Sequence, residues 1–250
     1  MLKTRIIPCL DVIKNKVVKG VNFKNIKVMG NAVEMAKNYS LSGADELCML
    51  DINASYQNRK TFIKTVEAIA KVINIPLTVG GGVSTLSDIT DLLNAGADKV
   101  SINSAAVKNP KIIKQSSLRH GSQCIVVAID AKRYENQMRV VVKGGREITS
   151  KELVSWAKKV QLLGAGEILL TSMDTDGVQN GFDSKMLKKV TNNVSLPVIA
   201  SGGVGNLEHF YLGHLTKSTG LLAASVFHSG KYKIKTVKKY LDQKGVPVRL

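Results

Sequence analysis

The sequence predicts a single domain, residues 1–250, that folds as a (β/α)8 barrel of the TIM type built from two fused half-barrels of about 1–121 and 122–250. Three observations support this prediction. Short apolar runs alternate with amphipathic stretches, there are eight such pairs, and one sequence offset relates the two halves of the chain. Eight strand–helix units in 250 residues also match the usual size of such a barrel.

The apolar runs predict strands and the amphipathic stretches predict helices. The predicted strands are 6–11, 46–51, 76–79, 98–103, 123–130, 167–172, 197–200 and 221–225. The predicted helices are 32–42, 60–72, 86–94, 110–119, 151–163, 184–190, 207–215 and 234–243. Thr149 and Glu152 have the spacing of a capping box for the fifth helix. A doubly wound open sheet is the alternative, but no Gly-x-Gly-x-x-Gly follows the first strand.

The offset between the halves is 121 residues, and it holds at three separate strand ends. GADEL at 43–47 recurs as GAGEI at 164–168, and IPLTVGGG at 75–82 recurs as LPVIASGG at 196–203. The same shift carries Ser104 onto Ser225. Because chance similarity between βα units would not keep one register, the pattern predicts a duplication.

The chain is strongly basic, with 36 Lys and Arg against 19 Asp and Glu and a net charge of +17. Such a charge suits nucleic acid, a membrane surface or a phosphorylated substrate. The lysines are dispersed, however, and only six Tyr, five Phe and one Trp could stack on bases. We therefore expect no nucleic-acid partner. The densest cluster is predicted to form a solvated helix face: Lys231, Lys233, Lys235, Lys238 and Lys239.

No apolar run approaches the roughly 20 residues that a membrane-spanning helix needs, so we expect no membrane partner. Cys9, Cys48 and Cys124 fall inside predicted strands at spacings that fit no zinc site. Buried thiols of this kind are typical of a reducing compartment, so the cytoplasm is the expected location. We expect neither a metal nor a cofactor.

Two apolar runs about half a chain apart each end in an aspartate, Asp11 in the first strand and Asp130 in the fifth. In an eight-stranded ring these positions lie opposite each other, at the carboxyl-end face that carries the chemistry of such barrels. Opposed carboxyls in a partly desolvated mouth can serve as acid and base. The alternative is that one of them only orients a lysine such as Lys19 or Lys132.

Glycine-rich turns follow the third and seventh strands, at 80–82 and 201–203, where backbone amides can approach a phosphate closely. The next strand ends add amides and hydroxyls, so the sequence predicts two phosphate cradles across one mouth. A tight turn is the alternative at each. Lys19 is expected on a lid formed by the long first loop, 12–29, and the fifth loop, 133–148, has a hairpin-like alternation. The predicted substrate-binding residues are Lys19, Gly82, Ser101, Asn103, Ser104, Thr171, Asp176, Gly177, Gly202, Gly203, Ala224 and Ser225.

Four charged residues stand at the starts of strands, on the face opposite the mouth. They are Arg5, Glu46, Lys99 and Glu167, and Glu46 and Glu167 are repeat partners. Such residues face solvent or form a polar plug in the barrel floor. We predict an ordered ring of ion pairs there.

The motifs IIPCLDV at 6–12, TVGGG at 78–82, DKVSIN at 98–103, AIDAK at 128–132, GAGEILL at 164–170 and AASVFH at 223–228 resemble the cyclase subunit of imidazole glycerol phosphate synthase (HisA/HisF family). The resemblance covers essentially the whole chain. It implies a lyase-type cyclase in histidine biosynthesis that takes ammonia from a HisH-like glutaminase partner in a heterodimer. Its bisphosphate substrate is PRFAR, and its products are imidazole glycerol phosphate and AICAR.

Carried over by position, the resemblance makes Asp11 and Asp130 the acid/base pair and the floor ring of Arg5, Glu46, Lys99 and Glu167 an ammonia gate. Gly82, Asn103 and Ser104 would hold one phosphate, and Asp176, Gly177, Gly203 and Ser225 the other. The chain departs from the family's usual residues at Asn53, Thr175 and 217–220, and in the first loop, where Asn15 can adopt the left-handed conformation that a turn needs. None of these departures is expected to touch the acid pair or the gate.

Three other functions compete with this one. The sister isomerase of the same pathway shares the repeat and the paired aspartates but needs no ammonia gate. A cyclase-like enzyme that amidates a surface sugar would not need the intact Asp11 and both cradles. A non-catalytic barrel that uses its charge to bind nucleic acid would not need paired carboxylates at all.

Overall fold

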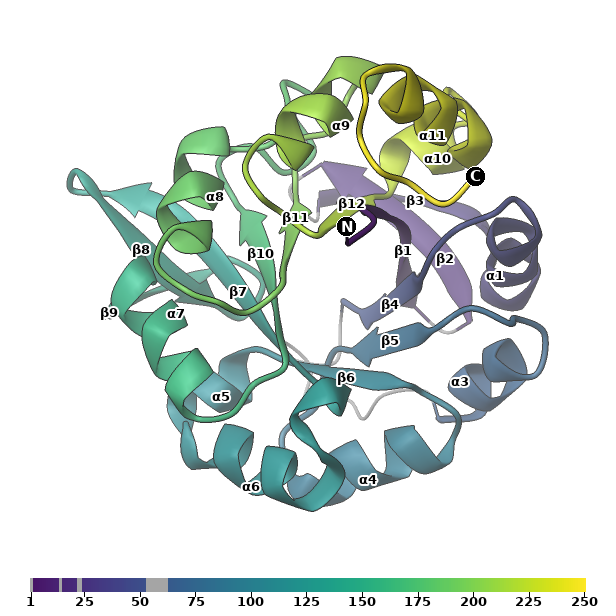
Figure 1. The fold of residues 1–250 in the computed structure, drawn as a ribbon. Coiled ribbons are helices and arrows are strands. Elements are labelled where there is room, and N and C mark those ends of the chain that lie inside the picture. The colour runs from purple at the N-terminus through teal and green to yellow at the C-terminus, as the bar shows by residue number, and fades with distance from the viewer. Residues whose placement is uncertain (1, 14, 22–23, 53–62) are drawn as a thin grey trace.

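The computed structural model describes residues 2–13, 15–21, 24–52 and 63–250. Eight parallel strands close into a barrel and helices surround it, which confirms the predicted fold class (Figure 1). The ring runs β1, β4, β5, β6, β7, β10, β11 and β12 and closes where β12 pairs with β1. These strands are β1 (Arg5–Ile13), β4 (Leu47–Asp51), β5 (Leu77–Gly80), β6 (Lys99–Ile102), β7 (Ile125–Tyr134), β10 (Glu167–Ser172), β11 (Val198–Ser201) and β12 (Gly220–Ala223).

The outer layer contains a helix at or near every predicted position. These helices are α1 (Ala32–Leu41), α3 (Ile63–Ala70), α4 (Leu86–Asn94), α6 (Lys111–His120), α7 (Leu153–Leu162), α8 (Ser184–Thr191), α9 (Leu207–His214) and α11 (Ile234–Gln243). The predicted helix 60–72 begins within 53–62, outside the described residues, as does Asn53. Within the described ranges, three short helices were not predicted: α5 (Ser104–Lys108), η1 (Ser122–Cys124), which contains the third cysteine, and α10 (Ser225–His228).

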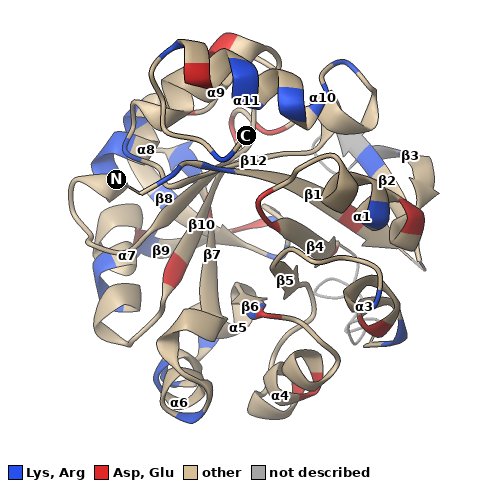
Figure 2. Ribbon diagram, turned by 45° about the vertical axis from the view of Figure 1, so that its right-hand side comes forward, with Lys and Arg blue, Asp and Glu red and all other residues tan. Residues whose placement is uncertain are grey.

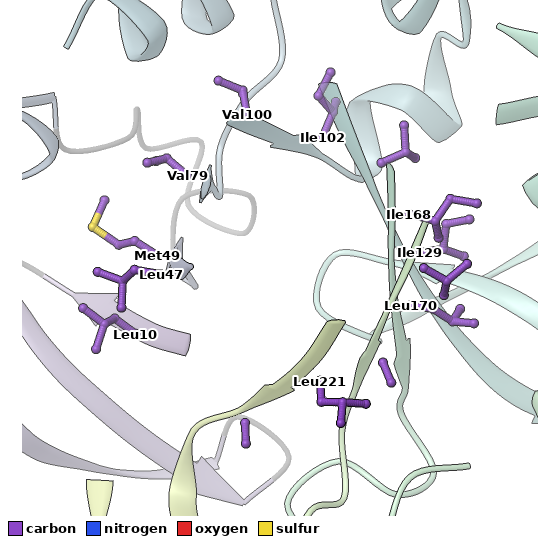
Figure 3. Close-up of a cluster of buried hydrophobic side chains, with 14 of the residues drawn as sticks. Leu10, Leu47, Met49, Val79, Val100, Ile102, Ile129, Ile168, Leu170 and Leu221 are labelled. Atoms are coloured by element: carbon purple, nitrogen blue, oxygen red, sulfur yellow. The ribbon is translucent and has the colours of Figure 1, made fainter. Parts of the chain in front are cut away.

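Alternation along the strands divides the apolar residues into two cores. On β1, Ile6, Leu10 and Val12 belong to the large outer core between strands and helices. Figure 3 shows strand residues of this core around the ring, among them Leu10, Val100 and Leu221. Ile7 and Cys9 point the other way, into the lumen. They join an inner core that also contains Cys48, Val126, Leu169, Ile199 and Leu222.

Both long loops form β-hairpins. β2 (Lys16–Val21) pairs with the end of β1 and with β3 (Lys24–Asn31), so the expected lid is a ribbon that continues the sheet. Its first turn is possible because Asn15 adopts a φ of 63°. The second hairpin, β8 (Gln137–Val142) and β9 (Glu147–Glu152), extends from the end of β7, as the alternation in the fifth loop indicated.

The predicted capping box of the fifth helix is wrong. Glu152 is itself the N-cap of α7 and accepts hydrogen bonds from the amides of Val154 and Ser155. The hydroxyl of Thr149 instead donates to the carbonyl oxygen of Val140 across the hairpin. The hairpin extends further than expected, so it removes Thr149 from the helix start.

Lys and Arg are spread over helices on several sides of the barrel (Figure 2). Lys233, Lys235 and Lys239 are exposed as predicted. Lys238 is not, because only 3% of it is exposed and its ammonium pairs with Asp45 at 2.7 Å. Among the described residues, no helix is long and apolar enough to cross a membrane.

Candidate active site

One pocket of about 1010 Å³ opens at the carboxyl ends of the barrel strands. It brings together side chains and backbone from β1, β2 and the loops after β4, β5, β6, β10, β11 and β12. Both predicted carboxylates and every predicted substrate-binding residue line it: Asp11, Lys19, Gly82, Ser101, Asn103, Ser104, Asp130, Thr171, Asp176, Gly177, Gly202, Gly203, Ala224 and Ser225.

Asp130 is half-buried on β7, on one side of this pocket. Its Oδ2 accepts a hydrogen bond of 2.9 Å from the side-chain amide nitrogen, Nδ2, of Asn103. Burial raises the pKa of Asp130 to about 6. The hydrogen bonds from Asn103 and Thr171 oppose this rise, whereas the negative charge of Asp176 adds to it. Asn103, predicted to hold phosphate, thus directs its side chain to the carboxyl.

Asp11 on β1 is 7% exposed, and its Oδ2 lies 3.4 Å from the ammonium of Lys19. Burial raises the pKa of Asp11, and the positive charge of Lys19 counteracts part of that rise. The hairpin therefore brings Lys19 to the mouth, where the prediction placed it. The two carboxyls differ, because one is paired with a cation and the other with neutral donors.

The two glycine turns have the same unusual backbone. Gly81 and Gly82 have φ of +95° and +66°, and Gly202 and Gly203 have φ of +90° and +102°. A Cβ on Gly81 would collide with the backbone of Asp51, and one on Gly203 with the carbonyl of Gly181. Only glycine fits these positions, so each turn presents backbone instead of side chain to the pocket.

Ser104 and Ser225 open the short helices α5 and α10 directly after their strands. Each therefore brings a hydroxyl and a first-turn amide to the pocket wall beside a glycine turn. In the second cradle, the hydroxyl of Thr175 donates to the carbonyl oxygen of Gly202 at 3.2 Å. The unusual residue at position 175 thus holds the turn together.

Sequence reasoning missed the tip of the second hairpin (residues 143–146), which bends over the first cradle. The amide of Lys143 donates to the hydroxyl oxygen of Ser104 at 3.2 Å. Lys143, Gly144 and Arg146 line the pocket, as does Lys108 at the end of α5. No motif marks these cations, because a hairpin of unknown twist does not reveal which strand end it will cover.

The four charged residues of the floor do form the predicted ring. Arg5 pairs with Glu46 at 2.7 Å and also with Glu167, while Lys99 reaches the same two carboxylates at 3.0 and 2.8 Å. Both carboxylates are almost fully buried, whereas the side chains of Arg5 and Lys99 are 24% and 20% exposed. Each anion thus bridges both cations, and the ring covers the lower end of the inner core.

Two threonines join the ring that the sequence did not point to. Thr78 donates to Glu46 at 2.6 Å, and Arg5 donates to the hydroxyl oxygen of Thr219 at 3.2 Å. Thr219 lies in the unusual segment 217–220, so the expectation that no departure touches the floor is wrong. The short segment returns the chain to the start of β12, next to Arg5.

The arrangement favours proton transfer on an anionic ligand held at two points. The buried carboxyl of Asp11 and the half-buried carboxyl of Asp130 face one pocket, and a glycine turn with an adjacent serine stands at two of its walls. In the described ranges, no group of three or more His, Cys, Asp or Glu side chains could hold a metal ion.

Comparison with known proteins agrees with this geometry. The family model for histidine biosynthesis proteins matches residues 5–233. "Imidazole glycerol phosphate synthase subunit HisF" of Prochlorococcus marinus subsp. pastoris is 53% identical over 253 residues, covering 100% of this chain and 99% of its own. The HisF subunit of Natranaerobius thermophilus is 54% identical over 100% of this chain and 100% of its own. The HisF subunit of Campylobacter concisus is also 54% identical, over 98% of this chain and 98% of its own. The chain therefore belongs to the histidine biosynthesis protein family, among the HisF subunits of imidazole glycerol phosphate synthase.

Proposed function

We propose that this chain is an ammonia-dependent cyclase that converts PRFAR to imidazole glycerol phosphate and AICAR. The observation that carries the proposal is the pair of carboxyls, Asp11 and Asp130, with raised pKa values in a pocket flanked by two glycine cradles. A substrate with a phosphate at each end is anchored at both cradles, which leaves its middle between the carboxyls. The names of the close relatives support the same reaction.

The carboxyls have different tasks in this proposal. Asp130, with a pKa of about 6, can gain or lose a proton near neutral pH, as an acid/base catalyst must. The positive charge of Lys19 lowers the pKa of Asp11 and so favours its ionised form. The ammonium of Lys19, 3.4 Å from this carboxyl, also lies close to the reacting atoms. Asn103 and Thr171 hold the Asp130 carboxyl in place by hydrogen bonds.

Ammonia enters, in this proposal, through the floor ring from a glutaminase subunit docked below it. The ring stands at the lower end of the lumen, and the partly exposed Arg5 and Lys99 present positive charge to a partner. Between the ring and the carboxyls lie the apolar side chains and two thiols of the inner core. A neutral molecule such as ammonia crosses such a lining at less cost than an ion.

The test is turnover of PRFAR with an ammonium salt and this chain alone. The parent is expected to form imidazole glycerol phosphate, and Asp130→Asn is expected to abolish the reaction. Asp242→Asn, an exposed carboxylate on α11, serves as the matched control and should leave turnover unchanged. Undiminished turnover in Asp130→Asn excludes the assigned role.

The ammonia path has its own test. Lys99→Met removes one of the two cations that bridge Glu46 and Glu167. The substitution should change turnover with glutamine and a glutaminase subunit more than turnover with free ammonium. Only the ammonia released from glutamine must pass the ring. Equal changes in turnover with both ammonia sources would show that ammonia does not pass through the ring.

A further inference from the structure

The lumen holds two thiols side by side. Cys9 on β1 and Cys48 on β4 are Cα partners in adjacent parallel strands, so both side chains leave the sheet on the same face. Both are free, and they are 3% and 2% exposed within the inner core. A hydrogen bond with Cys48, and then burial, raise the pKa of Cys9 well above its ordinary value. The two thiols therefore lie side by side, and Cys9 keeps its proton at neutral pH.

The pair lies directly below the reacting carboxyls. The sulfur of Cys9 is 3.9 Å from Oδ1 of Asp11, and Cys9 lines the pocket, so the pair can be reached from the mouth. Along the inward face of β1, Cys9 stands between Ile7 and Asp11. An atom bound here blocks the lumen between the floor ring and the carboxyls.

The strand spacing decides what the pair can bind. Neighbouring strands lie about 4.8 Å apart. Residues directly opposite each other on one face of a sheet have Cβ atoms about 4.5–5.5 Å apart. A disulfide needs Cβ atoms about 3.8 Å apart, so β1 and β4 would have to approach by about 1 Å within a closed barrel. A metal ion with two bonds to sulfur of about 2.3 Å spans sulfurs as far apart as about 4.6 Å. The spacing therefore suits a bridging ion better than a sulfur–sulfur bond.

The environment decides which ion fits. The described residues offer no group of three or more metal-binding side chains here, whereas zinc normally takes four ligands. Soft ions accept thiolates alone. A divalent ion with two thiolates is neutral, whereas a monovalent ion leaves a negative charge in an apolar core beside Asp11. We propose that Cys9 and Cys48 form a two-coordinate site for a soft divalent metal ion of the mercury class.

The binding step is an exchange of protons for metal. Each thiol loses its proton to the solvent, the metal releases two water or chloride ligands, two metal–sulfur bonds form, and nothing is oxidised or reduced. The bound ion closes the lumen below Asp11, so it inhibits the reaction when ammonia is supplied through the floor. This last consequence rests on the proposed cyclase function, whereas the binding itself does not.

The experiment uses the full chain with Cys124→Ala, which leaves the pair as the only thiols, because the chain has three cysteines. Mercuric chloride is added and the protein is then challenged with an equal concentration of glutathione. We expect one mercury per chain, seen in native mass spectra as a gain of one mercury less two protons, and retained against glutathione. The matched control, Cys48→Val in the same background, fills a similar apolar volume and should lose its mercury to glutathione.

Two mercury ions per chain, or equal retention in Cys48→Val, would overturn the site. Loss of two hydrogens on mild diamide treatment would show that the sulfurs reach disulfide distance, and it would overturn the preference for a bridging ion. Turnover with glutamine and a glutaminase subunit, measured on the same samples, should fall in proportion to bound mercury, because that ammonia must pass the lumen, and full glutamine-dependent turnover with mercury bound overturns the blockage. Retained mercury in a chain that never converts PRFAR leaves the site standing and removes the proposed function.

Discussion

Replacement of Asp130 by asparagine should stabilise the fold near neutral pH while it abolishes turnover. Burial raises the pKa of this carboxyl from 3.8 to about 6. Each pKa unit corresponds to about 1.4 kcal/mol, so ionising Asp130 in the folded chain costs up to about 3 kcal/mol. Because the side chain is half-buried and water screens part of that cost, we expect a gain of about 1–3 kcal/mol in the free energy of unfolding.

The pH dependence identifies the cause. Below about pH 4, Asp130 is protonated in both the folded and the unfolded chain, so its ionisation costs no stability. As the pH rises to about 6 the unfolded chain releases the proton first, and above this range the full penalty applies. Urea unfolding across this range should show Asp130→Asn and the parent equal at acid pH and separated at pH 7. An equal difference at both pH values, or none at pH 7, refutes the reasoning.

Asp88 provides a control of opposite sign. Burial raises the pKa of this carboxyl, but hydrogen bonds from Ser84 and Thr85 outweigh burial and lower it overall. Its stabilising contribution is present at neutral pH and is lost as the pH falls through the lowered pKa. Asp88→Asn should therefore be less stable than the parent at pH 7, with the difference vanishing at acid pH.

Three further outcomes are expected. Arg146→Gln should raise the KM for the bisphosphate about fivefold, the equivalent of about 1 kcal/mol, without changing kcat, whereas Arg139→Gln, on the same hairpin but outside the pocket lining, should not; a loss in kcat alone contradicts a binding role. Lys238→Ala should cost about 2–4 kcal/mol of stability because it leaves a buried carboxylate without its closest cation, while the exposed Lys239→Ala should cost under about 0.5 kcal/mol in the same urea titration. At constant free ammonia, turnover should change with a midpoint near pH 6, the pKa of Asp130, and a flat profile from about pH 5 to 8 contradicts acid/base use of this group.

The barrel could be predicted because its evidence is local. Each strand is a short apolar run, and alternation along it separates inward from outward residues without knowledge of the neighbouring strands. Asp11 and Asp130 end such runs, so the common edge of a parallel sheet was enough to bring them to one pocket. The duplication into half-barrels stays a prediction. Gly81 and Gly202 occupy equivalent turns in the two halves, but this symmetry describes the present fold and not its evolutionary origin.

The features that sequence reasoning missed depend on contacts between distant segments. The charge cluster predicts that Lys238 is exposed, but its ammonium donates hydrogen bonds to Asp45 and to the carbonyl oxygen of Arg249. Arg146 lies far from the first cradle in sequence and reaches it only because the second hairpin folds back over α5. Thr219, in a segment that is not expected to touch the gate, accepts a hydrogen bond from Arg5 on the floor. Periodicity indicates which face of a helix or strand a residue occupies, but not which distant residue contacts it.

The inward face of β1 carries Arg5, Ile7, Cys9 and Asp11 in strict alternation. Inserting or deleting one residue anywhere between the first and the last would turn either the arginine or the aspartate out toward the helices. A change of two residues keeps both inside but moves them apart or together by about 7 Å, well beyond the reach of either set of partners. The spacing of the two ends is thus as constrained as their identities. In evolution, β1 can tolerate new side chains more readily than a new length.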